Sequence, residues 1–142
     1  PRWERTLQPL EIKRLLEVAD KRQRIEEVVK LLEGEVRSLA QTKPAPDIVL
    51  LALTQEVIEQ AHSVRVTGNF YFNLRRAIKA RAMRWGVPVQ IVQPATVGGK
   101  RAAGRQLQEK APRAWNFCTA LYYKAEGVPW RPLAFEQEAC FV

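Results

Sequence analysis

The sequence predicts an α/β fold in which helices flank a mostly parallel sheet, with a helical extension at the N-terminus. Two short and continuous apolar runs, DIVLLAL (47–53) and VPVQIVQ (87–93), have the length of strands that are covered on both faces. Helical patterns alternate with these runs, which is typical of parallel sheets. The chain has 142 residues, of which 46% are hydrophobic, so it can bury the core of one domain.

The first 43 residues are expected to be helical. Apolar residues recur at helical spacing between residues 8 and 41, and charged residues fill the outer face. Gly34 is a possible break in this helix. The stretch TKPAPD (42–47) then stops the helix, because a residue that precedes proline avoids helical backbone angles. We therefore divide the chain into a helical extension, residues 1–43, and an α/β domain, residues 44–142.

The elements of the α/β domain follow in order. Thr54 is expected to cap a helix after the first strand. The next helix carries an apolar stripe and ends at a glycine; its residues are Leu74, Ile78, Ala82, Trp85 and Gly86. After the second strand we expect an exposed loop (94–106), a helix from about residue 112 to 125, and two last strands in RPLAFE (131–136) and EACFV (138–142).

Charge is distributed unevenly along the chain, whose formal net charge is +8. Residues 1–46 contain ten Lys/Arg and eight Asp/Glu, whereas residues 65–124 contain twelve Lys/Arg and a single acid, Glu109. The backbone of a nucleic acid is the commonest partner that offsets such a concentration of positive charge. A membrane surface is the rival partner, but no helical pattern pairs a wide Trp/Phe/Leu face with a lysine-rich one.

The chain is expected to be cytoplasmic. No apolar run approaches the roughly 18 residues of a membrane span, and the first twenty residues do not resemble a signal peptide. Cys118 and Cys140 lack the spacing of a metal site, and we interpret both as small buried side chains in a reducing compartment.

Five polar side chains are candidates for a ligand site. We expect a Rossmann-like sheet, and ligands of such sheets bind outside the carboxyl ends of the strands. Gln90 lies within or at the end of the second strand, and Arg75 and Lys79 lie one turn apart on the helix before it. Asn116 and Lys124 lie eight residues apart on the later helix. If these helices flank the same strand end, the five side chains converge on one site of the size of an anion.

Catalysis is not expected from this inventory. Glu109 is the only acid between residues 65 and 124, so a two-metal carboxylate centre lacks ligands. The single histidine, His62, has no Cys or Ser partner in a known motif, and we interpret it as a helix-surface or half-buried side chain. TVGGKRAAG (96–104) lacks the pattern GxxxxGK[ST] and is interpreted as an exposed basic loop.

NLRRAIKARAMRWGVPVQIV (73–92) and RAWNFCTALYYKAEGVPW (113–130) together resemble the MID domain of prokaryotic Argonaute proteins. PDIVLLAL (46–53) matches the first core strand of that domain, and ACFV (139–142) looks like the opening strand of the PIWI domain that follows it. The resemblance covers about residues 44–142, and the preceding helices look like the linker that enters MID. It implies a domain that holds the 5′ end of a guide strand in a prokaryotic defence protein.

The resemblance also implies residue roles. Lys79, Gln90 and Lys124 match the positions that bind the 5′ phosphate, and Asn116 matches a position that supports the nearby backbone. Arg75 stands where many members have an aromatic residue or histidine that stacks on the first base; a guanidinium plane can stack there too and can also reach a phosphate. Ala120 replaces a polar residue that helps some members to hold a metal ion.

The expected function is therefore binding of a single-stranded guide, RNA or DNA, through its 5′ phosphate, with the PIWI domain of the same protein as a partner. Mg²⁺ at the 5′ phosphate is expected only in the full-length protein, because the sequence ends at Val142 before the PIWI carboxylate. Two alternatives stay open. One is a basic α/β adaptor for nucleic acid or protein without an end-specific pocket, and the other is a fragment of an enzyme whose active site lies elsewhere.

Overall fold

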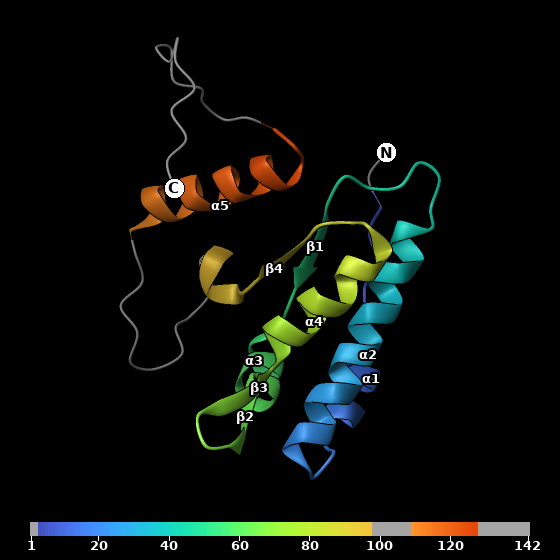
Figure 1. Cartoon of the computed structure of the whole chain (residues 1–142), viewed down its shortest axis with the longest axis vertical. Helices are drawn as coiled ribbons and strands as arrows, with labels where there is room; N and C mark the ends of the chain where they lie inside the picture. The colour runs from blue at the N-terminus through green and yellow to red at the C-terminus, as the bar shows by residue number, and fades with distance from the viewer. Residues whose placement is uncertain (1–2, 98–108, 128–142) are drawn as a thin grey trace.

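The computed structural model describes residues 3–97 and 109–127 (Figure 1). Its elements are, in order, α1 (Pro9–Leu16), α2 (Lys21–Ala40), β1 (Val49–Ala52), α3 (Gln55–Ala61), β2 (Ser63–Thr67), β3 (Phe70–Asn73), α4 (Leu74–Ala82), the 3-10 helix η1 (Met83–Trp85), β4 (Val89–Val92), the 3-10 helix η2 (Pro94–Val97) and α5 (Lys110–Lys124). The mixed α/β composition predicted from the sequence is confirmed. Most of the basic loop and both expected C-terminal strands lie outside the described residues.

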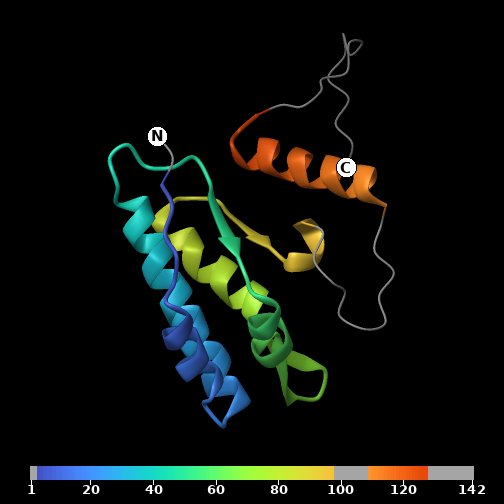
Figure 2. The same ribbon diagram turned by 180° about the vertical axis from the view of Figure 1, so that it is seen from behind.

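The two continuous apolar runs pair as parallel strands. Val49 of β1 lies opposite Val89 of β4, and Ala52 lies opposite Val92. Figures 1 and 2 show α5 on one side of this pair and the N-terminal helices on the other. Val49 and Val89 are buried in the core, whereas Leu50 and its partner Gln90 point to the opposite face, where Leu50 is half exposed. The parallel pairing is thus confirmed, while a Rossmann-like sheet needs further strands and stays a prediction.

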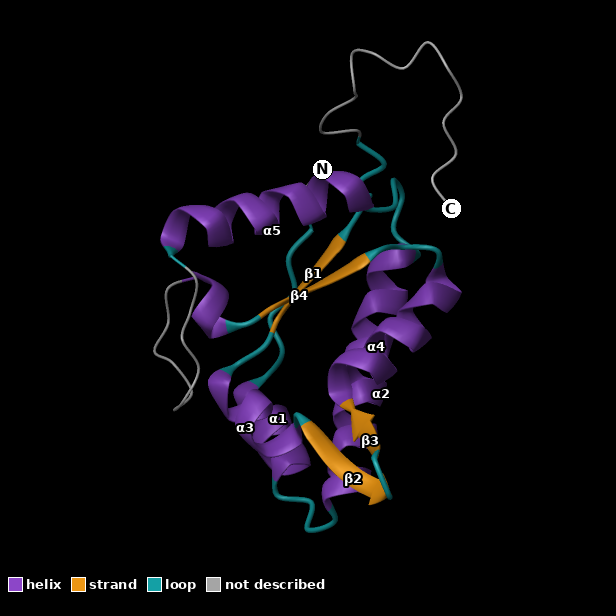
Figure 3. Cartoon of the chain, turned by 60° about the vertical axis from the view of Figure 1, so that its left-hand side comes forward, coloured by secondary structure: helices purple, strands orange, loops and turns teal. Residues whose placement is uncertain are grey.

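An antiparallel hairpin, β2–β3, was not predicted. It forms a second sheet, separate from β1–β4, in which Ser63 lies opposite Asn73 (Figure 3). Gly68 turns the chain with a positive φ of 52°, which glycine adopts without steric cost. Glycine and asparagine between the runs VRV and FYF are typical of a tight hairpin, so the signal was present in the sequence. Within the described residues, the sheet structure is therefore half antiparallel and not mostly parallel.

The N-terminal helical region breaks earlier than expected. Helix α1 ends at Leu16 and α2 begins after Asp20, whose carboxylate accepts a hydrogen bond from the backbone N–H of Gln23 at 2.7 Å. This is a typical N-cap, which satisfies a backbone donor at the start of the helix. Gly34 lies inside α2, so the expected break there was wrong.

The core joins the N-terminal helices to the rest of the fold. Its largest fully buried side chains are Ile25, Val29 and Val36 of α2 and Ile78 of α4, and the same cluster contains residues of β1 and β4. Arg81 of α4 also forms an ion pair with Glu33 of α2 at 3.1 Å. The boundary between residues 43 and 44 stays a prediction, but α2 packs as an integral part of this core.

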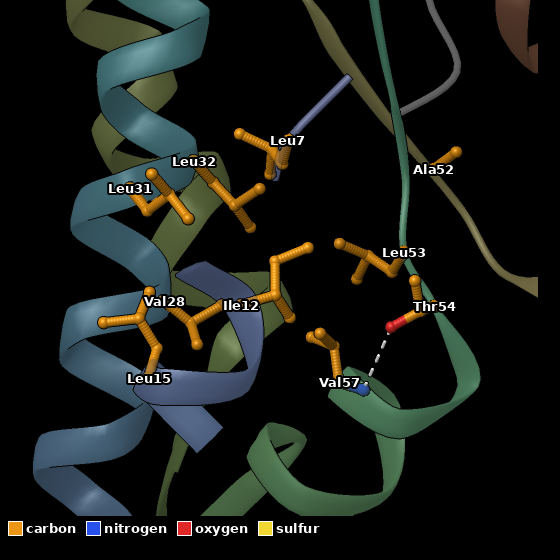
Figure 4. Close-up of a pocket in the computed structure, with 10 residues that line it drawn as sticks. All are labelled: Leu7, Ile12, Leu15, Val28, Leu31, Leu32, Ala52, Leu53, Thr54 and Val57. Carbon is orange, nitrogen blue, oxygen red and sulfur yellow. Dashed lines mark hydrogen bonds between the residues drawn. The ribbon is translucent and has the colours of Figure 1, made fainter. Parts of the chain in front are cut away.

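A small apolar cavity lies between α1, α2 and the turn from β1 into α3 (Figure 4). Its volume is about 40 Å³, and its walls include Leu15, Leu32 and Val57. Thr54 also lines it, and the Thr54 hydroxyl accepts a hydrogen bond from the Val57 N–H at 3.4 Å, as expected for the cap of α3. The apolar walls indicate a gap in packing and no polar ligand site.

Candidate anion-binding site

Helix α4 positions two of the predicted cations. The Asn73 side chain caps its first turn by accepting from the Arg76 N–H at 3.2 Å. Leu74, Ile78 and Ala82 are buried in the core, which fixes the rotation of the helix as the sequence predicts. Arg75 and Lys79 therefore lie one turn apart beside the buried stripe, with Arg75 exposed and Lys79 half-buried.

Helix α5 brings Lys124 to the sheet. The Lys124 ammonium donates to the backbone carbonyl of Val89 at 3.1 Å and also to Oε1 of Gln90. The amide nitrogen of Gln90 donates to the Ile91 carbonyl at 3.0 Å, which orients the amide oxygen toward the lysine. These hydrogen bonds connect the last residue of α5 to the first two residues of β4.

Positive charge accumulates around this contact. Burial lowers the pKa of Lys124, and the nearby Lys79 and Arg75 lower this pKa further by repulsion. Within residues 3–97 and 109–127, neither Lys79 nor Arg75 has a carboxylate partner. Three cations thus share one site with the neutral Gln90, and an anion bound there would relieve their repulsion. We call Arg75, Lys79, Gln90 and Lys124 the cationic cluster.

Asn116 lies apart from the cationic cluster. It is exposed on α5 and has an interaction of its own, and eight residues of helix separate it from Lys124 by about 12 Å. The structure therefore brings together four of the five predicted residues. A ligand longer than a single anion would be needed to contact both Asn116 and Lys124.

We expected the site at the carboxyl ends of the strands, but the contacts of Lys124 lie at the start of β4. Lys124 contacts Val89 and Gln90, which are the first two residues of β4. The cause is the short connection through Gly86, whose φ of 68° ends the helical segment and turns the chain directly into β4. Helix α4, which carries Arg75 and Lys79, therefore packs beside β4. Sequence reasoning also missed the Val89 carbonyl, because any residue type supplies this acceptor.

The cationic cluster does not suit a bound Mg²⁺ ion. Mg²⁺ takes oxygen ligands, commonly carboxylates, and the cluster offers only the Gln90 amide oxygen, which already accepts from Lys124. Ala120, one turn before Lys124, adds no ligand. In the part of the chain that the structure describes, no group of three or more His, Cys, Asp or Glu could hold a metal ion.

Two other reactive side chains lie outside the cluster. His62 is exposed, as one of the expected interpretations had it, and its Nδ1 lies 3.1 Å from the Ser63 hydroxyl. Cys118 is a free and exposed thiol, so its predicted burial was wrong; it lies on α5, which contributes no buried side chain among its described residues. Cys140 lies outside the described residues.

No helix in residues 3–97 or 109–127 has the length and apolar character needed to cross a membrane.

Comparison of the chain with models of known protein families finds no match. A search among curated proteins finds no significant match either.

Proposed function

We propose that this chain binds the phosphorylated 5′ end of a single-stranded guide nucleic acid, as the MID module of a prokaryotic Argonaute. The observation that supports the proposal is the placement of Lys124. Its ammonium donates hydrogen bonds to Val89 and Gln90 and is repelled by the positive charges of Lys79 and Arg75. A phosphate supplies the missing negative charge and several acceptor oxygens for these donors.

A terminal phosphate fits this cluster better than an internal one. A phosphate monoester carries about −1.5 to −2 charges at neutral pH, whereas each internal phosphate of a strand carries one. Three cations around one point match the larger charge. The Gln90 amide adds hydrogen-bonding capacity without adding repulsion.

Each side chain has a role in this proposal. Lys79 and Lys124 contact the phosphate directly, and Gln90 holds the Lys124 ammonium in place. The exposed Arg75 lies at the edge of the cluster, where it stacks on the first base or reaches the phosphate. Asn116 contacts the backbone beyond the first nucleotide, and a PIWI domain of the same cytoplasmic protein covers the site.

The test compares two strands of the same sequence that differ only in a 5′ phosphate or a 5′ hydroxyl. We expect the phosphorylated strand to bind at least tenfold more tightly in fluorescence anisotropy, which corresponds to about 1.4 kcal/mol. Equal affinity for the two strands would contradict the proposal and favour a basic adaptor without an end-specific pocket.

A further inference from the structure

We infer that the sheet-facing side of α5 continues from the cationic cluster as a track for the backbone of the bound strand, in which Arg113 contacts an internal phosphate. The inference rests on the proposed function, because it assumes that the 5′ end lies at Lys124.

Helical geometry places Arg113 and Lys124 on one face of α5. They are eleven residues apart, which is within about 20° of three complete turns and corresponds to about 16 Å along the axis. The contacts of Lys124 with β4 show that this face looks toward the sheet. Arg113 is half-buried like Lys124, whereas Trp115 and Tyr122 on the opposite face are exposed.

Arg113 has no counter-ion in the described structure. Glu109 lies one turn before it, but the bond between the two residues runs from the Arg113 backbone N–H to the Glu109 carbonyl, and the described residues contain no ion pair of their side chains. A half-buried guanidinium without a carboxylate is suited to a phosphate, because its planar donors match two phosphate oxygens.

Two half-buried side chains lie between the two cations on this face of α5. Phe117 and Ala120 lie there, an aromatic ring and a methyl group between two positive charges. Among the described residues, none in α5 belongs to the hydrophobic core, so core packing does not account for this face. Cations interspersed with an aromatic ring are typical of surfaces that bind single strands. The 16 Å separation corresponds to about five nucleotides of a stacked strand.

The length of the ligand tests this inference. Arg113→Gln should weaken binding of a 5′-phosphorylated strand of about twelve nucleotides by about five- to tenfold, and the slope of log affinity against log salt should fall by about 0.7. A 5′-phosphorylated dinucleotide is too short to reach Arg113 and should lose less than about twofold. Arg14→Gln removes the same charge from an exposed position on α1, distant from α5 (Figure 3), and should leave the affinity for both ligands unchanged.

A chemical change in the ligand tests the same contact without depending on the variant's folding. A neutral methylphosphonate is placed at one internal linkage at a time in the longer strand. In the parent protein, the neutral group should weaken binding at one linkage within roughly the first six nucleotides. The effect of that linkage should disappear in Arg113→Gln.

Three outcomes would overturn the inference. They are equal losses on the dinucleotide and the longer strand, an unchanged affinity of Arg113→Gln for the longer strand, and the absence of any sensitive linkage. Failure of the proposed function is recognised separately, because the parent protein would then not distinguish a 5′ phosphate from a 5′ hydroxyl.

Discussion

At the scale of single residues, the candidate site depends on the environment of Lys124. It donates to Val89 and Gln90, both uncharged, while its charged neighbours are Lys79 and Arg75. Side-chain types and their spacing were sufficient to predict from the sequence that Arg75, Lys79 and Gln90 lie near Lys124. The Val89 carbonyl and the position of the cluster at the start of β4 could not be predicted, because they depend on how the chain turns at Gly86.

The titration of Lys124 is the first prediction. Its folded-state pKa lies below that of the unfolded chain, so between these two values the unfolded chain binds more protons, and this lysine makes stability rise with pH. A bound phosphate should raise the pKa of Lys124, and affinity should fall as the pH rises through the lowered pKa. NMR of ¹³C-methylated lysines, with the signal assigned by Lys124→Arg, measures both effects.

The signal of Lys124 in the urea-unfolded chain provides the reference for this titration. If Lys124 titrates in the folded protein as it does in the unfolded chain, or if its pKa does not move when a 5′-phosphorylated strand binds, the description of its environment is wrong.

At the scale of elements, long periodic helices and continuous apolar strands were predicted well, and short connections were not. The stripe of α4 and the caps at Thr54 and Gly86 formed as expected, because local geometry determines them. The β2–β3 hairpin was missed because its exposed aromatic residues, such as Phe70 and Tyr71, do not form a buried run. Gly34 was overinterpreted, since packing of α2 against the core outweighs the weak helix propensity of one glycine.

At the scale of elements, two glycine substitutions should change the stability of the chain in opposite directions. Gly34→Ala should stabilise the chain by about 0.5–1 kcal/mol, because alanine favours the helix and nothing lies within 4 Å of the added methyl group. Gly86→Ala should destabilise it by about 1–2 kcal/mol, because its φ of 68° disfavours a side chain. Urea unfolding monitored by circular dichroism measures both changes, and a destabilising Gly34→Ala would argue against a continuous α2.

At the scale of the whole molecule, α2 shares one buried core with the α/β part. Ile25, Val29 and Val36 are completely buried against α4 and the strands, so removing α2 would expose the centre of the core. The sequence predicted helix between residues 8 and 41, but it did not predict that this region packs on the following domain, because amphipathic periodicity identifies the buried face of a helix and not its partner.

Truncation tests this organisation. We expect residues 44–142 alone to lack a cooperative urea transition, whereas residues 1–142 unfold in one transition. As a matched control, removing residues 1–6 retains both N-terminal helices and should preserve the cooperative transition. A cooperatively folded fragment of residues 44–142 would show that the predicted boundary separates two independent units.

The most direct test of the central claim combines removal of the Lys124 ammonium with removal of the 5′ phosphate. Affinities are measured for the parent and Lys124→Ala with phosphorylated and with hydroxyl strands, and the four values form a cycle that isolates the interaction between the two groups. If Lys124 contacts the terminal phosphate, the coupling should be about 1.5–3 kcal/mol, and the substitution should barely affect the hydroxyl strand. A coupling near zero, with equal losses on both strands, would show that Lys124 is a general contact and that the cationic cluster is not the 5′-phosphate site.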